Sequence, residues 1–266
     1  MTLQPPSHAA RAHSFNAAAA EYAAHRPSYP PALFDAIEEL TGHPLAGARV
    51  ADVGAGTGIS TALLHARGAR VVAVEPGEGM AAQLHAGLPD VPLVRGNGNA
   101  LPLADDSADL ITYAQAWHWT DPALAVPEAV RVLRPGGALA LWWNTDDLGV
   151  PWIAESAARI NAHFGVDPAR ERSERGDLVL AADPTGTLEF GRRKVRWSRS
   201  VPVDKHLANM ASHSVFLVQE KEATESFLAG EREHLLAVFP DGLVEETYIV
   251  DLLVGVNARP TAAPGA

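Results

Sequence analysis

Cysteine is absent from all 266 residues. The absence excludes disulfide bonds, thiolate metal sites and cysteine nucleophiles, and it fits a reducing compartment. Long hydrophobic runs are also lacking, because the longest, Ala138–Trp143, is far too short to cross a bilayer. The segment Met1–His8 has neither the charged nor the apolar region of a signal peptide. We therefore expect a cytoplasmic protein with no membrane segment.

Positive charge is scarce as well. The 21 lysines and arginines are outnumbered by 32 aspartates and glutamates, and the formal net charge of −11 opposes binding to a polyanion. The one basic segment, Arg192–Arg199, alternates cationic and apolar positions from Lys194 onward, which is typical of a half-buried strand with a cationic face in water. We therefore expect a small-molecule partner and no nucleic acid. The sequence leaves the oligomeric state open.

Apolar runs that read as buried strands alternate with helical patterns over the first half of the chain. Such alternation predicts a parallel sheet covered on both faces, with a ligand beyond the carboxyl ends of the strands. Strands are expected over 49–53, 70–75, 91–94, 110–114 and 138–143, and helices over 15–22, 31–40, 57–67, near 80–84 and over 123–133. The Pro135–Gly137 segment is expected to be the turn before the fifth strand.

The pattern changes after Asn144. Helices are expected over 151–164, 204–211 and 224–239, with strands over 188–197 and 248–256. This organisation predicts a single domain over 15–256, divided into a cofactor-binding core (15–144) and a substrate cap with the late strands (145–240). Residues 1–14 are expected to be disordered, and 257–266 to form a mobile tail.

The most informative motif is a strand that runs into three alternating glycines, Gly54, Gly56 and Gly58. Glycines let the backbone turn sharply and approach a ligand without side-chain obstruction. The next apolar run ends at Glu75, whose carboxylate is placed to accept hydrogen bonds from both hydroxyls of a ribose. Together these features predict a ligand that contains adenosine.

The glycine spacing distinguishes between adenosine ligands. The dinucleotide fingerprint has glycine at the first, third and sixth positions. Here the glycines stand first, third and fifth, and Ile59 takes the sixth place. Asp52, two residues before Gly54, would repel a pyrophosphate but suits a ligand with an ammonium group and a sulfonium. Nicotinamide-dependent oxidoreduction is therefore disfavoured.

Six motifs occur in a family order: Asp52–Gly58, Val74–Pro76, Leu101–Leu103, Asp109–Leu110, Ala114–Trp119 and Arg131–Gly137. In these motifs the chain resembles the class I S-adenosylmethionine-dependent methyltransferases, of the small-molecule group with a Leu-Pro motif after the third strand. The resemblance covers residues 15–144, with weaker support to 256. It implies a Rossmann-like, seven-stranded, mostly parallel sheet with helices on both faces and a helical cap over the site.

The resemblance also implies roles for individual residues. The glycine loop would lie along the methionine and ribose, Asp52 would orient the amino group directly or through water, and Glu75 would hold the ribose. The expected cofactor-binding residues are Tyr22, Arg26, Asp52, Gly54, Ala55, Gly56, Thr57, Gly58, Glu75, Pro76, Met80, Asn97, Gly98, Ala114 and Gln115. Tyr22 and Arg26 belong to an N-terminal helix that folds over the cofactor in this family.

Three of these positions have a second interpretation. Asn97 stands where the family has an aspartate that contacts adenine, and Gly98 follows it, so the pair also fits a simple Asn-Gly turn. A lone methionine such as Met80 is typical of a core as well as of an adenine wall. Arg26 is placed either to approach the methionine carboxylate or to cap the preceding helix.

Methyl transfer from a sulfonium is an in-line displacement, which depends mainly on orientation. A general base is needed only for a protonated hydroxyl or an acidic carbon. His118 is the first candidate base, and a structural histidine in the His-Trp turn is the other interpretation. Trp119, Trp143 and Trp152 are expected to line an acceptor pocket.

No metal site is expected, because Asn144, Asp146 and Asp147 fit a solvated loop better than a magnesium site. The sequence thus predicts transfer of a methyl group to a small organic acceptor. The alternative is a protein of the same fold that binds S-adenosylmethionine for another reaction or for sensing.

Overall fold

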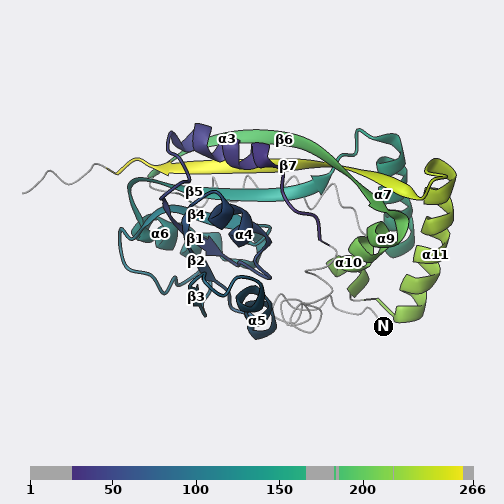
Figure 1. Cartoon of the computed structure of the whole chain (residues 1–266), viewed down its shortest axis with the longest axis horizontal. Coiled ribbons are helices and arrows are strands. Elements are labelled where there is room, and N and C mark those ends of the chain that lie inside the picture. Colours follow the sequence, from purple (N-terminus) through teal and green to yellow (C-terminus); the bar gives the residue numbers. More distant parts are fainter. Residues whose placement is uncertain (1–25, 166–182, 184–185, 218, 260–266) are drawn as a thin grey trace, which may run out of the picture. The chain divides into compact units, whose positions relative to one another are not determined.

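The structure is a computed structural model that describes residues 26–165, 183, 186–217 and 219–259 (Figure 1). The predicted helix over 15–22 and the termini 1–14 and 260–266 lie outside the described residues. The strands are β1 Arg49–Val53, β2 Arg70–Val74, β3 Leu93–Val94, β4 Ala108–Ala114, β5 Leu133–Asp146, β6 Leu188–Pro202 and β7 Leu243–Asn257. The helices are α3 Pro31–Thr41, α4 Ile59–Ala66, α5 Glu78–Gly87, η1 Trp117–Trp119, α6 Pro122–Val132, α7 Pro151–Phe164, α9 Val203–Ala211, α10 Ser214–Leu217 and α11 Lys221–Val238.

The strands form one seven-stranded sheet in the order β3-β2-β1-β4-β5-β7-β6. The pairs β1–β2, β1–β4, β2–β3 and β4–β5 are parallel, whereas the arrows of β5 and β7 point in opposite directions (Figure 1). The predicted α/β class and the Rossmann-like, mostly parallel sheet are therefore confirmed. From β1 the chain continues to β2 and β3 on one side of the sheet and then returns to β4 and β5 on the other side. The carboxyl ends of β1 and β4 therefore lie next to each other at a switch in topology.

The chain divides into two compact units. Within the described part of the chain, the Rossmann unit comprises residues 28–144, 183, 186–195 and 250–259. The helical unit comprises residues 26–27, 145–165, 196–217 and 219–249 of the same part. Asn144 and Thr145 fall on opposite sides of this division. The predicted single domain over 15–256 stays a prediction.

Local sequence signals set several helix ends. Pro31 occupies the first turn of α3, and Gly42 ends that helix with φ of 69°. Helix α4 begins at Ile59, two residues later than predicted, because Gly58 precedes it with φ of 89°. Asp121 caps α6 by accepting a hydrogen bond from the amide of Ala123 at 3.0 Å.

The late strands are longer than predicted. The predicted turn at Pro135–Gly137 is wrong, because this segment belongs to β5. The pairing of β5 with β4 shifts register between Ala108 and Leu110, as at a β-bulge, and the shift accommodates the segment. Strand β7 reaches Asn257, the first residue of the predicted tail, whose buried amide donates to the carbonyls of Leu133 and Arg134 at 3.2 Å. The short helix α10 was not predicted.

The basic segment is a strand, as predicted, and four of its arginines pair with carboxylates. In the Rossmann unit Arg192 pairs with Asp251 and Arg193 with Glu39. In the helical unit Arg196 pairs with Asp147 and Arg199 with Glu246.

Two adjacent tryptophans face opposite sides of β5, as strand geometry requires. Trp142 packs edge-on against Tyr29 and Phe34, at ring distances of 5.8 and 6.3 Å. Trp143 belongs to the buried cluster that includes Ala125 of α6 and Tyr113. The core of the Rossmann unit therefore lies on both faces of its sheet. Among the described residues, no helix is long and apolar enough to cross a membrane.

Candidate cofactor site

The loop between β1 and α4 is shaped by its three glycines, which have φ of 66°, 58° and 89°. A Cβ atom on Gly54 would lie 2.5 Å from the Cβ of Ala116, and one on Gly58 would lie 3.0 Å from the side chain of Leu84. A Cβ on Gly56 would meet no atom of the described residues within 4 Å. The outer glycines therefore pack against the protein, and Gly56 faces open space that a ligand can enter.

Glu75, the residue after β2, is fixed beside this loop. Its Oε2 accepts a hydrogen bond from the amide of Gly56 at 2.8 Å, and its Oε1 accepts one from the amide of Gly77 at 2.7 Å. Burial raises the pKa of the Glu75 carboxyl, and the two amides oppose that shift. Each carboxylate oxygen has two lone pairs, so each keeps one for a further hydrogen bond.

Asp52 is completely buried below the loop. Its two oxygens accept hydrogen bonds from the hydroxyls of Thr61 in α4 and Thr112 in β4, both at 2.7 Å. Burial raises the pKa of Asp52 to about 6, the two hydroxyls lower it, and the charge of Glu75 raises it further. The side chain therefore joins three elements that carry the loop. Sequence reasoning missed Thr61 and Thr112, although a threonine within the apolar run 110–114 is a usable signal.

The carboxyl end of β4 lies against the glycine loop through Ala116. Gln115, which follows Ala114, has φ of 59°, an uncommon conformation for a residue other than glycine. Its amide donates to the carbonyl of Trp142 at 3.0 Å, and its Nε2 donates to the carbonyl of Asn144 at 3.1 Å. Residues held in such conformations cluster at ligand sites.

Several buried polar atoms near these strand ends have no hydrogen-bond partner among the described residues. They are Oγ1 of Thr57, the hydroxyl of Tyr113, and Nε1 of Trp117 and Trp143. The rings of Tyr113 and Trp117 pack edge-on at 4.9 Å. A buried donor without a partner costs about 1 to 3 kcal/mol, so such atoms indicate a ligand or ordered water. Together with the space at Gly56, they fit an adenosyl cofactor. Tyr113 and Trp117 were not in the predicted set.

The segment after β3 is a turn anchored to α6. The Oδ1 of Asn97 accepts from the amide of Asn99 at 2.9 Å, as in the Asn-Gly turn that the sequence allowed. Gly98 is buried, and a Cβ there would lie 2.6 Å from the hydroxyl of Tyr113. The side-chain carbonyl oxygen of Asn97 keeps a second lone pair, so it can still accept a hydrogen bond from adenine. That contact stays a prediction.

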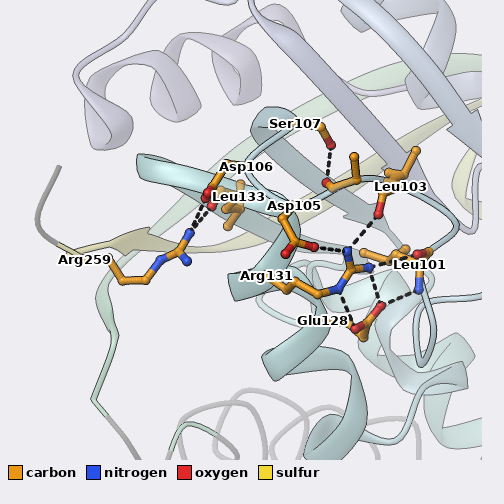
Figure 2. Close-up of polar contacts among 10 residues, drawn as sticks. Leu101, Leu103, Asp105, Asp106, Ser107, Glu128, Arg131, Leu133 and Arg259 are labelled. Atoms are coloured by element: carbon orange, nitrogen blue, oxygen red, sulfur yellow. Dashed lines mark hydrogen bonds and ion pairs between the residues drawn. The ribbon is translucent and has the colours of Figure 1, made fainter. Parts of the chain in front are cut away.

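Arg131 and Glu128 hold the Leu-Pro motif that follows this turn (Figure 2). Arg131 donates to the carbonyls of Leu101 and Leu103 at 3.0 and 2.8 Å, and Glu128 accepts from the amide of Leu101 at 2.8 Å. Arg131 also pairs with Glu128 and Asp105, which raises the pKa of the guanidinium.

The remaining predicted residues are distributed as follows. Met80 is buried in α5 and Pro76 is exposed. His118 lies in the single turn η1, with its ring 4.7 Å from that of Trp119, which is 36% exposed. Trp143 is only 5% exposed.

Two of the predicted site residues belong to the helical unit, and a third lies outside the described residues. Arg26 donates to the carbonyl of Ser212 at 3.3 Å, and Trp152 packs against Phe239 at a ring distance of 5.4 Å. Tyr22 lies outside the described residues. The described residues contain no group of three or more histidine or acidic side chains arranged to hold a metal ion.

Known proteins are similar to this chain in sequence and in fold. The family described as "Methyltransferase domain" matches residues 51–141. An uncharacterized methyltransferase of Mycobacterium tuberculosis is 40% identical over 250 residues, which is 94% of this chain and 96% of that protein. The malonyl-[acyl-carrier protein] O-methyltransferase of Methylococcus capsulatus is 41% identical over 136 residues, 48% of each chain.

A solved structure of a provisionally assigned type II methyltransferase from Anaeromyxobacter dehalogenans has a TM-score of 0.65 and 25% identity. The match covers 88% of this chain and 99% of that one. Because the mycobacterial relative is similar along almost its whole length, and because the sheet order and the glycine loop agree, the chain belongs to the class I S-adenosylmethionine-dependent methyltransferases and is an enzyme of methyl transfer.

Proposed function

We propose that the methyl acceptor is a small organic molecule and that the cofactor lies along the Gly54–Gly58 loop with its ribose hydroxyls on Glu75. The observation that carries the proposal is the Glu75 carboxylate, which two backbone amides hold beside the open space at Gly56. A carboxylate with one free lone pair on each oxygen matches a pair of neighbouring hydroxyl donors.

S-adenosylmethionine supplies an electrophilic methyl group on a sulfonium. The glycine loop would approach the ligand through its backbone, with Ala55 and Thr57 in the same segment, and the free hydroxyl of Thr57 would donate to it. Asp52 would act as a positioning residue, because its oxygens are used by Thr61 and Thr112, and its negative charge would favour a cationic ligand.

Other positions in the proposed site follow from the family pattern. Pro76 and Met80 would flank the adenine and Asn97 and Gly98 would border it, whereas Ala114 and Gln115 would offer backbone groups to the amino group. The roles that the family pattern gives to Tyr22, Arg26 and Trp152 stay predictions. The proposed acceptor residues of the Rossmann unit are His118, as a base for a protonated acceptor, and Trp119 and Trp143, as apolar walls.

A small acceptor is supported by the charge of the chain. The net charge of −11 opposes nucleic acid, and the arginines of β6 pair with carboxylates. A cytoplasmic location is likewise proposed, on the absence of cysteine.

Calorimetric titration with S-adenosylmethionine tests the proposed site. We expect Glu75→Ala to weaken binding about tenfold to a hundredfold, because the change removes charged hydrogen bonds worth about 1 to 3 kcal/mol. Glu78→Ala, an exposed change in α5, is the control and should bind as the wild type does. Equal affinities of Glu75→Ala and wild type would remove Glu75 from the site.

A further inference from the structure

Helices α7 and α11 of the helical unit contact each other at two places and leave a groove between them (Figure 1). Arg159 of α7 bonds to Glu231 of α11, and Trp152 of α7 packs against Phe239, the residue after α11. The later contact in α11 thus meets the earlier residue of α7, so the two helices are antiparallel. The lining residues lie between these contacts along both helices, and the groove has a volume of about 370 Å³. We call it the α7–α11 groove.

The lining of the groove includes an apolar surface that is anchored in the core of the helical unit. Leu235 is only 1% exposed and belongs to a buried cluster with Val203 and Val244. Trp152 packs against the same cluster and also lines the groove. Val238 adds apolar surface at the rim, where it is 50% exposed. An apolar ligand body therefore finds a preformed surface here.

The charged residues of the groove are mainly acidic. Glu155 of α7 and Glu233 of α11 are exposed, and no ion pair joins either of them to another described residue. The guanidinium of Arg159 donates two hydrogen bonds of 2.7 Å to Glu231, so that carboxylate offsets its charge. His234 is the other lining residue that can carry positive charge. The three carboxylates in and beside the groove therefore exceed the cations, which are two at most.

The pairing of Arg159 leaves Glu155 available to a ligand. Among the groups that raise the pKa of Arg159, the hydrogen bond to Glu231 comes first and the charge of Glu155 last. Glu155 and Glu233 come from different helices, so a cation between α7 and α11 lies within reach of carboxylates from both sides.

The chemistry of the lining selects the class of ligand. The carboxylates attract a cation and repel an anion, and the indole of Trp152 favours both cations and apolar groups. Leu235 and Val238 favour a hydrocarbon body. The volume lies near the lower end of the range for small-molecule pockets, so a small molecule fits the groove better than a protein segment does.

We propose that the α7–α11 groove binds a small organic cation in which an ammonium group is joined to an apolar body. Glu155 and Glu233 attract the ammonium group, and Trp152, Leu235 and Val238 contact the body. The ion pair of Arg159 and Glu231 closes one end of the groove. The inference goes beyond the proposed function, because the groove belongs to the helical unit and its occupation requires no cofactor.

The test compares three probes that share a phenyl ring on a three-carbon chain: 3-phenylpropylammonium, 3-phenylpropanol and 3-phenylpropanoate. Calorimetric titration at neutral pH and low salt should show the ammonium binding about fivefold more tightly than the alcohol, since two partly solvated charge pairs each contribute modestly. The carboxylate should bind most weakly. Added salt should reduce the preference for the ammonium. Equal affinities for the ammonium and the alcohol, or no binding of the ammonium, would overturn the proposal.

Charge variants test the two carboxylates. The double variant Glu155→Gln with Glu233→Gln should bind the ammonium and the alcohol equally. Glu222→Gln, an exposed change in α11 outside the groove lining, is the control and should keep the preference. A double variant that still prefers the ammonium as the wild type does would show that the carboxylates do not hold it.

A filling variant tests the location. Val238→Trp should weaken binding of the ammonium and the alcohol at least tenfold, because the larger side chain occupies the groove. Leu236→Trp makes the same change at an exposed neighbour outside the lining, and it should bind as the wild type does. Thermal melts verify that both variants fold. Unaltered binding by folded Val238→Trp would place the ligand elsewhere and overturn the proposal. Because these titrations contain no S-adenosylmethionine, their result does not depend on the proposed function.

Discussion

At the scale of single residues, three buried carboxylates are stabilised in different ways. Asp52 accepts from two hydroxyls, Glu75 from two backbone amides, and Glu246 from a guanidinium and an imidazole. Only Glu246 has cationic or potentially cationic hydrogen-bond partners, and only its pKa is lowered. The partners therefore decide how easily each carboxyl loses its proton.

The raised pKa of Asp52 gives the first prediction. Between the ordinary value of 3.8 and the folded value of about 6, the folded state binds a proton that the unfolded state does not. The contribution of Asp52 to the free energy of unfolding therefore falls as the pH rises through this window, by about 3 kcal/mol at most. We expect Asp52→Asn to remove this dependence.

Urea unfolding at a series of pH values across the window measures it. The control is Asp90→Asn, an exposed change in the turn before β3, which should follow the wild type. A pH dependence in Asp52→Asn that matches the wild type would contradict the assignment of the titration to Asp52.

The glycines of the loop give a second prediction. Gly54→Ala should destabilise the fold by more than about 2 kcal/mol, because the new Cβ would clash with Ala116 and alanine is strained at positive φ. Gly56→Ala should cost only about 1 kcal/mol of backbone strain, but it should weaken S-adenosylmethionine binding at least tenfold by filling the open space. Thermal melts and calorimetry measure the two effects, and similar profiles for both variants would argue against a ligand at Gly56.

At the scale of elements, the turn after β3 depends on α6. Arg131 ties the carbonyls of Leu101 and Leu103 to that helix, and Glu128 ties the amide of Leu101 (Figure 2). The rest of Figure 2 shows Arg259 paired with Asp106 and bonded to the carbonyl of Leu133. The Leu-Pro motif is therefore set by tertiary hydrogen bonds as well as by its own sequence.

We expect Arg131→Lys to destabilise the fold by about 1 to 2 kcal/mol, since an ammonium cannot reproduce the forked hydrogen bonds of a guanidinium and the site is partly exposed to water. Amide hydrogen exchange at Leu101 should quicken in the same variant. Arg70→Lys, an exposed change at the start of β2, is the control. Unaltered exchange at Leu101 would show that the Leu-Pro motif keeps its conformation without the hydrogen bonds from Arg131.

Elements with strong end signals were predicted best. The strand β1 and the helix α7 have the predicted bounds, because glycines or prolines flank them. The end of β6 was placed too early, at 197 instead of Pro202, and the start of β7 too late, at 248 instead of Leu243, since both strands continue beyond the apolar runs. The turn expected at Pro135–Gly137 failed for a related reason, because a bulge accommodates residues whose local preference is for a turn.

At the scale of the whole molecule, the two compact units make separate responses testable. In the helical unit, Arg159 of α7 forms two hydrogen bonds of 2.7 Å with Glu231 of α11, which is 2% exposed. Burial raises the pKa of Glu231, but the bonds from Arg159 and Ser156 outweigh it and lower the pKa overall. The pair therefore contributes stability above the ordinary pKa of 4.5 that is lost as the pH falls through the folded value.

We expect Glu231→Gln to destabilise the helical unit by about 2 kcal/mol, because it leaves Arg159 without its ionic partner. Hydrogen exchange monitored by mass spectrometry should rise in α7 and α11. S-adenosylmethionine should instead lower exchange in the Gly54–Gly58 loop of the Rossmann unit. Exposed Glu225→Gln is the control for the first effect. Faster exchange confined to the Rossmann unit in Glu231→Gln would contradict the prediction.

The sequence by itself determined the fold class, the glycine loop and the placement of Glu75, because these depend on local spacing: apolar runs, glycines at positive φ and one carboxylate at a strand end. It also indicated the family, since six motifs kept their order. Only the tertiary structure decided that Asp52 bonds to Thr61 and Thr112, and that Arg199, His206 and Glu246 meet in one cluster. Apart from the contact between Asp52 and Thr61, those hydrogen bonds join residues at least 40 positions apart along the chain, and burial rather than local pattern sets their chemistry.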